Sequence, residues 1–574
     1  MADEKRGNGE VTRAQEAALA RAELKRELGK ATTSAQRLDL LISHPRCEAL
    51  IPLMPAEDLY FTIKDVGLAD SVELVRLASP EQFRAFIDLD AWRRDHLEPA
   101  TALFWLRAAG TDEEEQRFRK KIHTLDIELL ELVLRSATRV HDLEEDPDPE
   151  PQGTSFRSPE GRYLVEYLVE GTEYLGVKRL LDELYAEDPF RTARLLEAVR
   201  WETPSELEET AFRWRSGRMQ DLGFPELSEA LSYFAWLDPD AALPVLEKAP
   251  HVPDSFFLVR FQPQGRFFDR VAALVPEADR SVLERQLVTV LNAVMVVESV
   301  DPGDFEQVQR ALLAARDTLS MGLEHAARGD VNAGLALLVA APLKRVFQVG
   351  VSLALRLKYR ADRLLKSGKA SLPGSKDQPL FDRPLDAVVA GLRRKRPQYA
   401  EALDDASAPE ERLRSFRDRE DVARVSAALD EAERLIEVLE RLGFDTKSGA
   451  QLAQACRPGE PLSFLRFSDF FLTALAHDLL GEGFTFDALK VDRVRAFADA
   501  AFAEQEGKPQ LSEAARRALA RLRGEARALS EGHARAATSF ENVLVTRLLE
   551  DVGEPWGLGT LAADTPLPLL LSKG

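Results

Sequence analysis

Apolar residues recur along this chain at the three- and four-residue spacing of amphipathic helices. Leu59, Ile63 and Val66 follow this spacing, and the apolar residues of several later segments do the same. Such a stripe covers one face of a helix, which can then pack against a neighbouring helix. The pattern therefore predicts a mainly α-helical protein.

A second pattern marks where many of these helices begin. A capping residue stands directly before proline in Ser79-Pro80, Asp188-Pro189, Thr203-Pro204 and Asp238-Pro239, with looser forms at Pro55, Pro99, Pro225 and Pro409. Proline suits the first helical position because the missing amide would have no partner there, and Ser, Thr or Asp can accept a bond from a free amide. These starts predict irregular stacking of short helices, solenoid-like in the N-terminal part, without a fixed repeat.

Few segments favour strands. Tyr163, Val165 and Tyr167 alternate with other residues after Ser158-Pro159-Glu160-Gly161, which has the proline and glycine of a type I turn. We expect at most a small β-hairpin here, and residues 256–261 are a second, shorter extended candidate.

Two apolar stretches indicate buried helices. Residues 287–300 are apolar nearly all round, as in a helix at the centre of a core. Residues 335–357 carry Pro342 and Lys344 in their middle, which favours two buried helices over one membrane helix. We therefore expect no membrane span.

Changes in composition divide the chain into six segments. We expect a flexible or helical arm at 1–37, a stacked-helix domain at 38–140, an acidic proline-rich linker at 141–155, a middle helical domain at 156–366, a linker at 367–383 and a C-terminal helical domain at 384–574. The tail after residue 564 either docks on the last domain or extends from it.

Charge and cysteine content exclude some partners and a disulfide-stabilised fold. The chain has 97 acidic and 76 basic residues, a net charge of −21, which makes nucleic acid and anionic membranes poor partners. Cys47 and Cys456 are its only cysteines, so a disulfide framework is excluded. With no apolar leader near its start, the chain is expected in the cytoplasm.

The densest candidate site lies between residues 201 and 236. Its tryptophans and arginines are of the types enriched at interface hot spots. The candidate interaction residues are Trp201, Glu209, Arg213, Trp214, Arg215 and Arg218. Thr203 and Glu206 suggest a capping box around Pro204. The favoured interpretation is nevertheless that the tryptophans fill a helix–helix core and the arginines pair with Glu206, Glu208 and Glu209, because tryptophan is usually largely buried.

Chemistry elsewhere is weakly indicated. His123, Asp126 and Glu128 are spaced to share a helix face and are candidate metal ligands, although a solvated face opposite an apolar stripe is the favoured explanation. Glu324-His325, with Arg328 and Asp330, could hold a general base or a helix-end histidine. The basic run 393–396 could contact phosphate or complete a helix C-terminus. Phosphate-loop, dinucleotide, nucleophile-elbow and zinc-helix motifs are missing, and no cofactor is expected.

Four phrases resemble an uncharacterised bacterial family of the delta-proteobacterial type, a domain of unknown function. They are IPLMPAEDLYFTIKDVGL, SPEQFRAFIDLDAW, SELEETAFRWRSGRMQDLGFPELSEAL and FDRPLDAVVAGLRRKRPQY. The resemblance implies bacterial origin and a large helical architecture, without an activity. The N-terminal helices also resemble the superhelical cytosolic domain of magnesium-channel and flagellar motor switch proteins.

Serial short helices without a catalytic motif favour a cytoplasmic scaffold that binds another protein. The alternative is an enzyme of unrecognised type that uses carboxylates and histidine, with or without a divalent metal.

Overall fold

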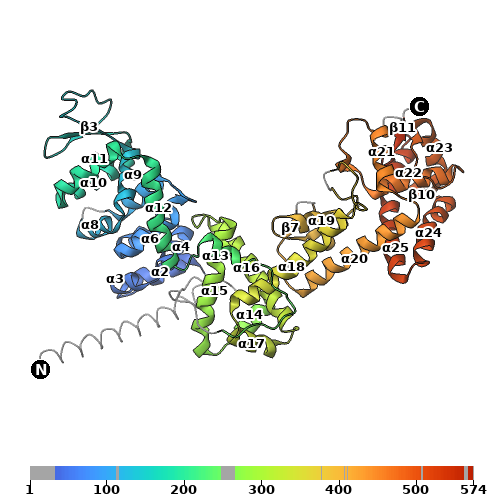
Figure 1. Ribbon diagram of the computed structural model, residues 1–574, viewed down its shortest axis with the longest axis horizontal. Coiled ribbons are helices and arrows are strands. Elements are labelled where there is room, and N and C mark those ends of the chain that lie inside the picture. Colours follow the sequence, from blue (N-terminus) through green and yellow to red (C-terminus); the bar gives the residue numbers. More distant parts are fainter. Residues whose placement is uncertain are drawn as a thin grey trace. The chain divides into compact units, whose positions relative to one another are not determined.

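The computed structural model describes residues 33–110, 115–246, 265–375, 378–405, 407–409, 412–505, 508–561 and 567–572 (Figure 1). It is mainly α-helical, as predicted, with short strands in small sheets. Two compact units divide the chain. Unit 1 comprises Met1–Ala235, Ala241–Leu319 and Ala326–Gln348, and unit 2 comprises Trp236–Asp240, Ser320–His325 and Val349–Gly574. The predicted arm and the extended candidate at 256–261 lie mainly or wholly outside the described residues.

Unit 1 begins with short helices that stack as the sequence predicts. They are α2 (Ser34–Ser43), α3 (Cys47–Leu50), α4 (Ala56–Val66), α5 (Val72–Leu77), α6 (Pro80–Asp90), α7 (Pro99–Ala109), α8 (Glu115–Thr124) and α9 (Ile127–Ala137). The rings of Tyr60, Phe86 and Trp105 meet at their centre, with centroids 5.3 to 6.4 Å apart. Burial of these large side chains supplies much of the local stability.

Most of the proline-marked starts are confirmed. Ser79 and Gln82 form a full capping box at α6, and Asp188 caps α11 (Pro189–Trp201). α12 (Pro204–Asp221) also begins as predicted, but Thr203 bonds the Glu206 side chain and not a backbone amide. Two predicted starts are wrong. Asp238-Pro239 forms a turn, and Pro409 accepts a turn bond from the Arg412 amide.

The predicted hairpin is present and belongs to a larger sheet. β4 (Ser155–Arg157) and β5 (Tyr163–Tyr167) are antiparallel, and the Gly161 amide bonds the Ser158 carbonyl across the turn. β3 (Thr138–Asp142) pairs with the other edge of β5. The third strand, β3, could not be predicted, because it follows α9 directly and carries no turn signal of its own.

The rest of unit 1 is helical. Its elements include α10 (Gly171–Glu187), α13 (Leu227–Ser232), α14 (Phe267–Ala272), α15 (Glu277–Glu298) and α17 (Val331–Ala340), and α16 (Phe305–Ala326) and α18 (Leu343–Lys366) contribute residues to both units. α15 contains the predicted central helix. The interrupted stretch 335–357 forms parts of α17 and α18, as expected for two helices. None of the helices in the described ranges is long and apolar enough to cross a membrane.

Unit 2 is built around a cluster of phenylalanines. Its main helices are α19 (Leu385–Arg393), α20 (Arg419–Arg441), α21 (Thr446–Cys456), α22 (Phe467–Leu479), α23 (Val494–Ala501), α24 (Glu513–Arg527), α25 (Glu531–Arg547) and α26 (Glu554–Gly557). Phe444 contacts Phe467, Phe470 and Phe486 edge to face. The tail docks on this unit, because β11 (Leu571–Ser572) pairs in parallel with β8 (Leu489–Lys490).

The small strand pairs are local. β1 (Trp92–Arg93) pairs with β2 (His96–Leu97), β6 (Tyr399–Ala400) with β7 (Leu413–Arg414), and β9 (Phe502–Gln505) with β10 (Lys508–Leu511). The acidic segment 141–155, expected as a linker, connects β3 to β4, and its Asp142 pairs with Arg162 and Arg200. The division of the chain into the six expected segments stays a prediction.

Candidate functional site

The tryptophan- and arginine-rich segment belongs to a layer of three helices. α9 packs against both α11 and α12. Arg135, late in α9, donates a 3.0 Å hydrogen bond to the carbonyl oxygen of Val199, late in α11. Arg218, late in α12, pairs with Asp126, which directly precedes α9. α11 therefore runs in the direction of α9, and α12 runs antiparallel to it.

Arg218 joins α12 to two carboxylates from distant parts of the chain. Its Nε lies 2.7 Å from Oδ2 of Asp88, and its Nη2 lies 2.9 Å from Oδ1 of the same residue. The guanidinium also bonds both oxygens of Asp126, at 3.1 and 2.7 Å. Burial alone would lower the pKa of Arg218, but the bonds to Asp88 and Asp126 raise it above its ordinary value.

Arg215 lies beside this cluster and faces inward as well. Its Nε donates a 2.7 Å bond to the backbone carbonyl of Asp88. Its guanidinium lies 5.5 Å from the ring centroid of Trp92 and 5.9 Å from that of Phe212. Burial lowers the pKa of Arg215 to about 10, so the side chain remains charged at neutral pH. We call Arg215 and Arg218 the inner arginines.

Trp201, the last residue of α11, faces solvent and is 65% exposed. Its indole Nε1 donates a 3.0 Å bond to Glu197, one turn earlier in the helix. The Arg200 guanidinium lies 5.1 Å from the ring centroid. The ring is therefore held in orientation although most of it is uncovered.

α12 also carries exposed residues of the predicted set. Trp214 is 57% exposed, and Arg213 pairs with Glu209 at 3.2 Å, both side chains being about three-quarters exposed. We call Trp201, Glu209, Arg213 and Trp214 the outer face. The six predicted residues thus divide into an exposed set of four and an inward set of two.

The favoured interpretation of this segment as a helix–helix core fits poorly. Trp201 and Trp214 do not fill a helix–helix core, because more than half of each side chain is exposed. Among the glutamates, Glu209 pairs with Arg213 as that interpretation expected. Glu208 instead lies 2.6 Å from Nδ1 of His96. Arg218 pairs with acids on α6 and directly before α9, and Arg215 bonds a backbone carbonyl of α6, so neither pairs with a glutamate of its own helix.

The three candidate metal ligands have separate surroundings. His123 Nε2 contacts the Glu187 carboxylate, and Asp126 is held by Arg218. Glu128 shares neither contact. Across the described parts of the chain, no group of three or more His, Cys, Asp or Glu side chains could hold a metal ion.

A shallow hollow lies beside His123. It is lined by His123, Arg191 and Thr192 and by apolar residues that include Ile122, Leu130 and Leu195. It separates the starts of α9 and α11, and none of the six outer and inner residues lines it.

The two remaining sequence candidates are engaged in structural contacts. His325 bonds Asp240 at 2.9 Å, and Asp330 caps α17 through the Ala333 amide. In the basic run, α19 ends at Arg393, and Lys358 donates bonds to the carbonyls of residues 392–394. Burial lowers the pKa of Arg396 to about 10. These contacts match the helix-end interpretation of both segments.

Sequence reasoning missed a buried polar cluster around Asp90. This carboxylate accepts bonds from Tyr60 and Lys64, each at 2.9 Å, and from the Trp105 indole at 2.8 Å. The available signal was the pair Asp88 and Asp90 within an otherwise apolar stretch of α6. An acid in such a context must be paired when it is buried.

Three of the four phrases that resemble a known family meet in these clusters, through α4, α6 and α12. A family model with the description "Family of unknown function (DUF6178)" matches residues 13–554. No curated protein and no solved structure matches the chain.

Proposed function

We propose that this chain, which belongs to the family of unknown function DUF6178, is a scaffold that binds a partner protein through the outer face. The observation that carries the proposal is the exposure of Trp201 and Trp214, at 65% and 57%. Tryptophan is highly buried on average in folded proteins, and it is enriched at the centres of protein interfaces. A partner would remove both rings from water.

The arrangement beneath the outer face supports binding more than catalysis. Asp88 and Asp126 bond Arg218, while Arg215 bonds the Asp88 carbonyl and lies over the Trp92 ring. A group that is locked in such contacts is poorly available to a substrate. The same contacts hold α6, α9 and α12 together, which keeps the outer face rigid and lowers the entropy cost of binding.

The setting that fits this function is the bacterial cytoplasm. The resemblance to a delta-proteobacterial type of family and the acidic composition support it. The likeness of the N-terminal stacked helices to the cytosolic domains of magnesium channels and the flagellar motor switch supports a role in protein assembly. All three remain part of the proposal.

Site-specific photo-cross-linking tests the proposal. We would place p-benzoylphenylalanine at position 214 of the full chain in its native host and identify the cross-linked protein. A matched control carries the same group in place of Phe104, an exposed residue of α7. We expect a discrete product from position 214 that is absent from position 104 and is lost when Trp201→Ser is added.

Two results would count against the proposal. One is the same set of products from positions 214 and 104, which would indicate random collisions. The other is an undiminished product after Trp201→Ser, with the thermal unfolding of the variant unchanged. Cross-linking to a second copy of the chain would show that the partner is this protein itself. Light scattering of the purified protein identifies this case, because it gives the molar mass of a dimer.

A further inference from the structure

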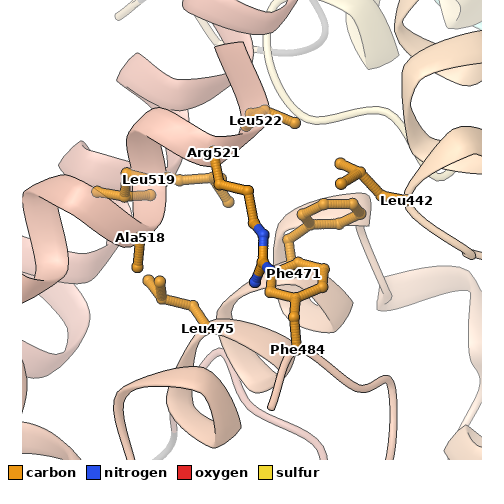
Figure 2. Close-up of a pocket in the computed structure, with 9 residues that line it drawn as sticks. Leu442, Phe471, Leu475, Phe484, Ala518, Leu519, Arg521 and Leu522 are labelled. Carbon is orange, nitrogen blue, oxygen red and sulfur yellow. The ribbon is translucent and has the colours of Figure 1, made fainter. Parts of the chain in front are cut away.

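A hollow in unit 2 lies among α22, α24 and α25 (Figure 2). Phe471 and Phe484 form part of its wall, with ring centroids 5.9 Å apart, and Arg521 lies beside them. The space has room for about one water molecule, so it does not take a ligand. The surface of α18, in the same unit, offers more.

The exposed side of α18 combines basic and aromatic residues. Arg356, Tyr359, Arg363 and Lys366 follow one another at three- and four-residue spacing, and all four are exposed. Residues at this spacing share one face of a helix. We call these four residues the α18 stripe.

Trp236 extends the α18 stripe. Its ring centroid lies 5.9 Å from that of Tyr359, and the two residues are 49% and 50% exposed. The Leu237 amide, next in the chain, donates a 2.9 Å bond to the Ser352 hydroxyl of α18, which holds Trp236 in this place. The pair of rings thus presents an aromatic surface to solvent beside the basic side chains.

α18 has more basic residues than its ion pairs use. Residues 356–366 contain five basic residues and one acidic residue. Arg356 and Arg360 form ion pairs with acidic residues of unit 2. The side chains of Arg363 and Lys366 make no hydrogen bond or ion pair with any residue that the structure describes. Positive charge in a last helical turn suits the helix dipole, but that effect leaves the exposed aromatic pair unexplained.

An acidic, proline-rich segment of the same chain has the complementary composition. Residues 146–151 read Asp-Pro-Asp-Pro-Glu-Pro, and the three acidic residues are exposed. Their carboxylates have no hydrogen-bond or ion-pair partner within the described ranges. The Asp146 amide bonds the Asp142 carbonyl at 2.9 Å. The Gln152 amide bonds the Glu166 carboxylate at 2.8 Å, so the segment is anchored at both ends.

The two surfaces match in chemistry. Carboxylates pair with arginine and lysine side chains, and proline-rich segments dock on exposed aromatic rings in several kinds of peptide recognition. The prolines also restrict the backbone of the segment before it binds, which lowers the entropy cost of association. Charge and aromatic contact therefore favour the same occupant.

We propose that residues 146–151 of one copy of this chain bind the α18 stripe and Trp236 of a second copy. The carboxylates of the segment would pair with Arg363 and Lys366, and its prolines would cover Tyr359 and Trp236. Each copy carries both surfaces, so the chain would associate with itself. The net charge of −21 makes copies repel each other elsewhere, and the contact should therefore be weak and depend on this local pairing.

Sedimentation velocity of the full chain tests the proposal. At about 100 μM protein and about 0.1 M salt, we expect association that is lost on roughly hundredfold dilution and at about 0.5 M salt, because salt screens exposed charges. Trp236→Ser should weaken the association roughly tenfold without a change of charge.

Charge reversal locates the contact. Arg363→Glu with Lys366→Glu should weaken the association roughly tenfold or more, and Asp146→Lys with Asp148→Lys should do the same. A mixture of these two double variants should associate again, because each acidic surface then meets a basic one. Both variants remain acidic overall, so attraction between net charges cannot produce this recovery.

Two controls isolate the contact from other effects. Arg516→Glu with Arg517→Glu changes the net charge equally at two exposed arginines of α24 and should leave the association unchanged. Trp201→Ser should also leave it unchanged, which separates this contact from self-association through the outer face. Thermal unfolding shows whether each variant is folded.

Three results would overturn the proposal. One is a monomer at every concentration, including a monomer whose acidic segment binds its own α18 stripe. The second is an equal loss of association in the α24 control, which would indicate an effect of net charge alone. The third is a mixture of the two folded double variants that stays monomeric.

Discussion

Gly303 lies directly against the carboxylate of Asp90. A side-chain carbon at position 303 would stand 2.6 Å from Oδ1 of Asp90 and 3.3 Å from Nζ of Lys64. The same Oδ1 accepts the bonds from Tyr60 and Lys64. A larger residue at position 303 would therefore have to displace Asp90 or the loop between α15 and α16.

Replacement of Gly303 by alanine should destabilise unit 1. The added methyl group would push Asp90 away from its donors, and overpacking of this kind costs about 1–3 kcal/mol. Thermal unfolding of the full chain is the measurement. Gly217→Ala is the control, because a Cβ there meets nothing within 4 Å and the helix should gain up to about 1 kcal/mol. Equal midpoints for the two variants would contradict the packing described.

Arg218→Ala should be among the most damaging single changes in unit 1. It would leave Asp88, whose side chain is 1% exposed, without its ionic partner. Breaking a buried pair in this way costs about 3–5 kcal/mol. Chemical denaturation provides the measurement, and circular dichroism shows whether the helices remain.

The matched change on the same helix is Arg213→Ala. Arg213 and Glu209 are largely exposed, and a pair of that kind contributes about 0.5 kcal/mol or less. A loss of stability as large as that of Arg218→Ala would show that the inner and outer arginines do not differ as described.

Glu57 should make stability depend on pH. Burial, above all, raises the pKa of this carboxyl from 4.5 to about 7, and the charge of Asp58 adds to the effect. The unfolded chain loses the proton at lower pH than the folded chain does. The free energy of unfolding contributed by Glu57 should therefore fall as the pH rises from 4.5 to 7 and stay level above that.

Glu57→Gln removes this dependence. Relative to the native chain, the variant should gain stability between those pH values, by about 3 kcal/mol at most. Denaturant unfolding at several pH values gives the difference. The slope with pH is the decisive quantity, since the amide can change the absolute stability by itself. Parallel profiles for the two proteins would refute the assignment.

Divalent metal ions should leave the unfolding midpoint unchanged. Asp126 is bonded to Arg218, and His123 contacts Glu187, so neither is free to join Glu128 in a metal site. A site occupied at a hundredfold excess over its dissociation constant would add about 2.7 kcal/mol. A midpoint that rises with zinc or magnesium, and no longer does so in Glu128→Gln, would restore the metal hypothesis.

Local signals explain how much of the fold could be predicted. Ser79 and Asp188 cap helices because the capping oxygen and the helix start are neighbours in sequence. Asp238 has the same signal, but its carboxylate accepts a bond from the Asp240 amide, and Pro244 soon follows. The resulting turn satisfies the backbone without a helix.

The candidate site could be predicted only in part. Residue types marked the segment around Trp201, but the direction of each side chain depends on remote partners. Arg218 turns inward because it bonds Asp88, which lies 130 positions earlier in the chain. The spacing of residues within one helix cannot predict a contact with a residue remote in sequence. For the same reason, the cluster around Asp90 could not be predicted.

Because Arg218 pairs with both Asp88 and Asp126, the contact should constrain which residues homologues carry at these positions. An exchange of Arg218 leaves Asp88 and Asp126 without the cation that they share, and an exchange of either aspartate removes one of the two carboxylates that hold Arg218 in place. Among homologues, positions 88, 126 and 218 are therefore expected to change together or not at all. Covariation of these three positions in an alignment of family members would therefore reflect their contact.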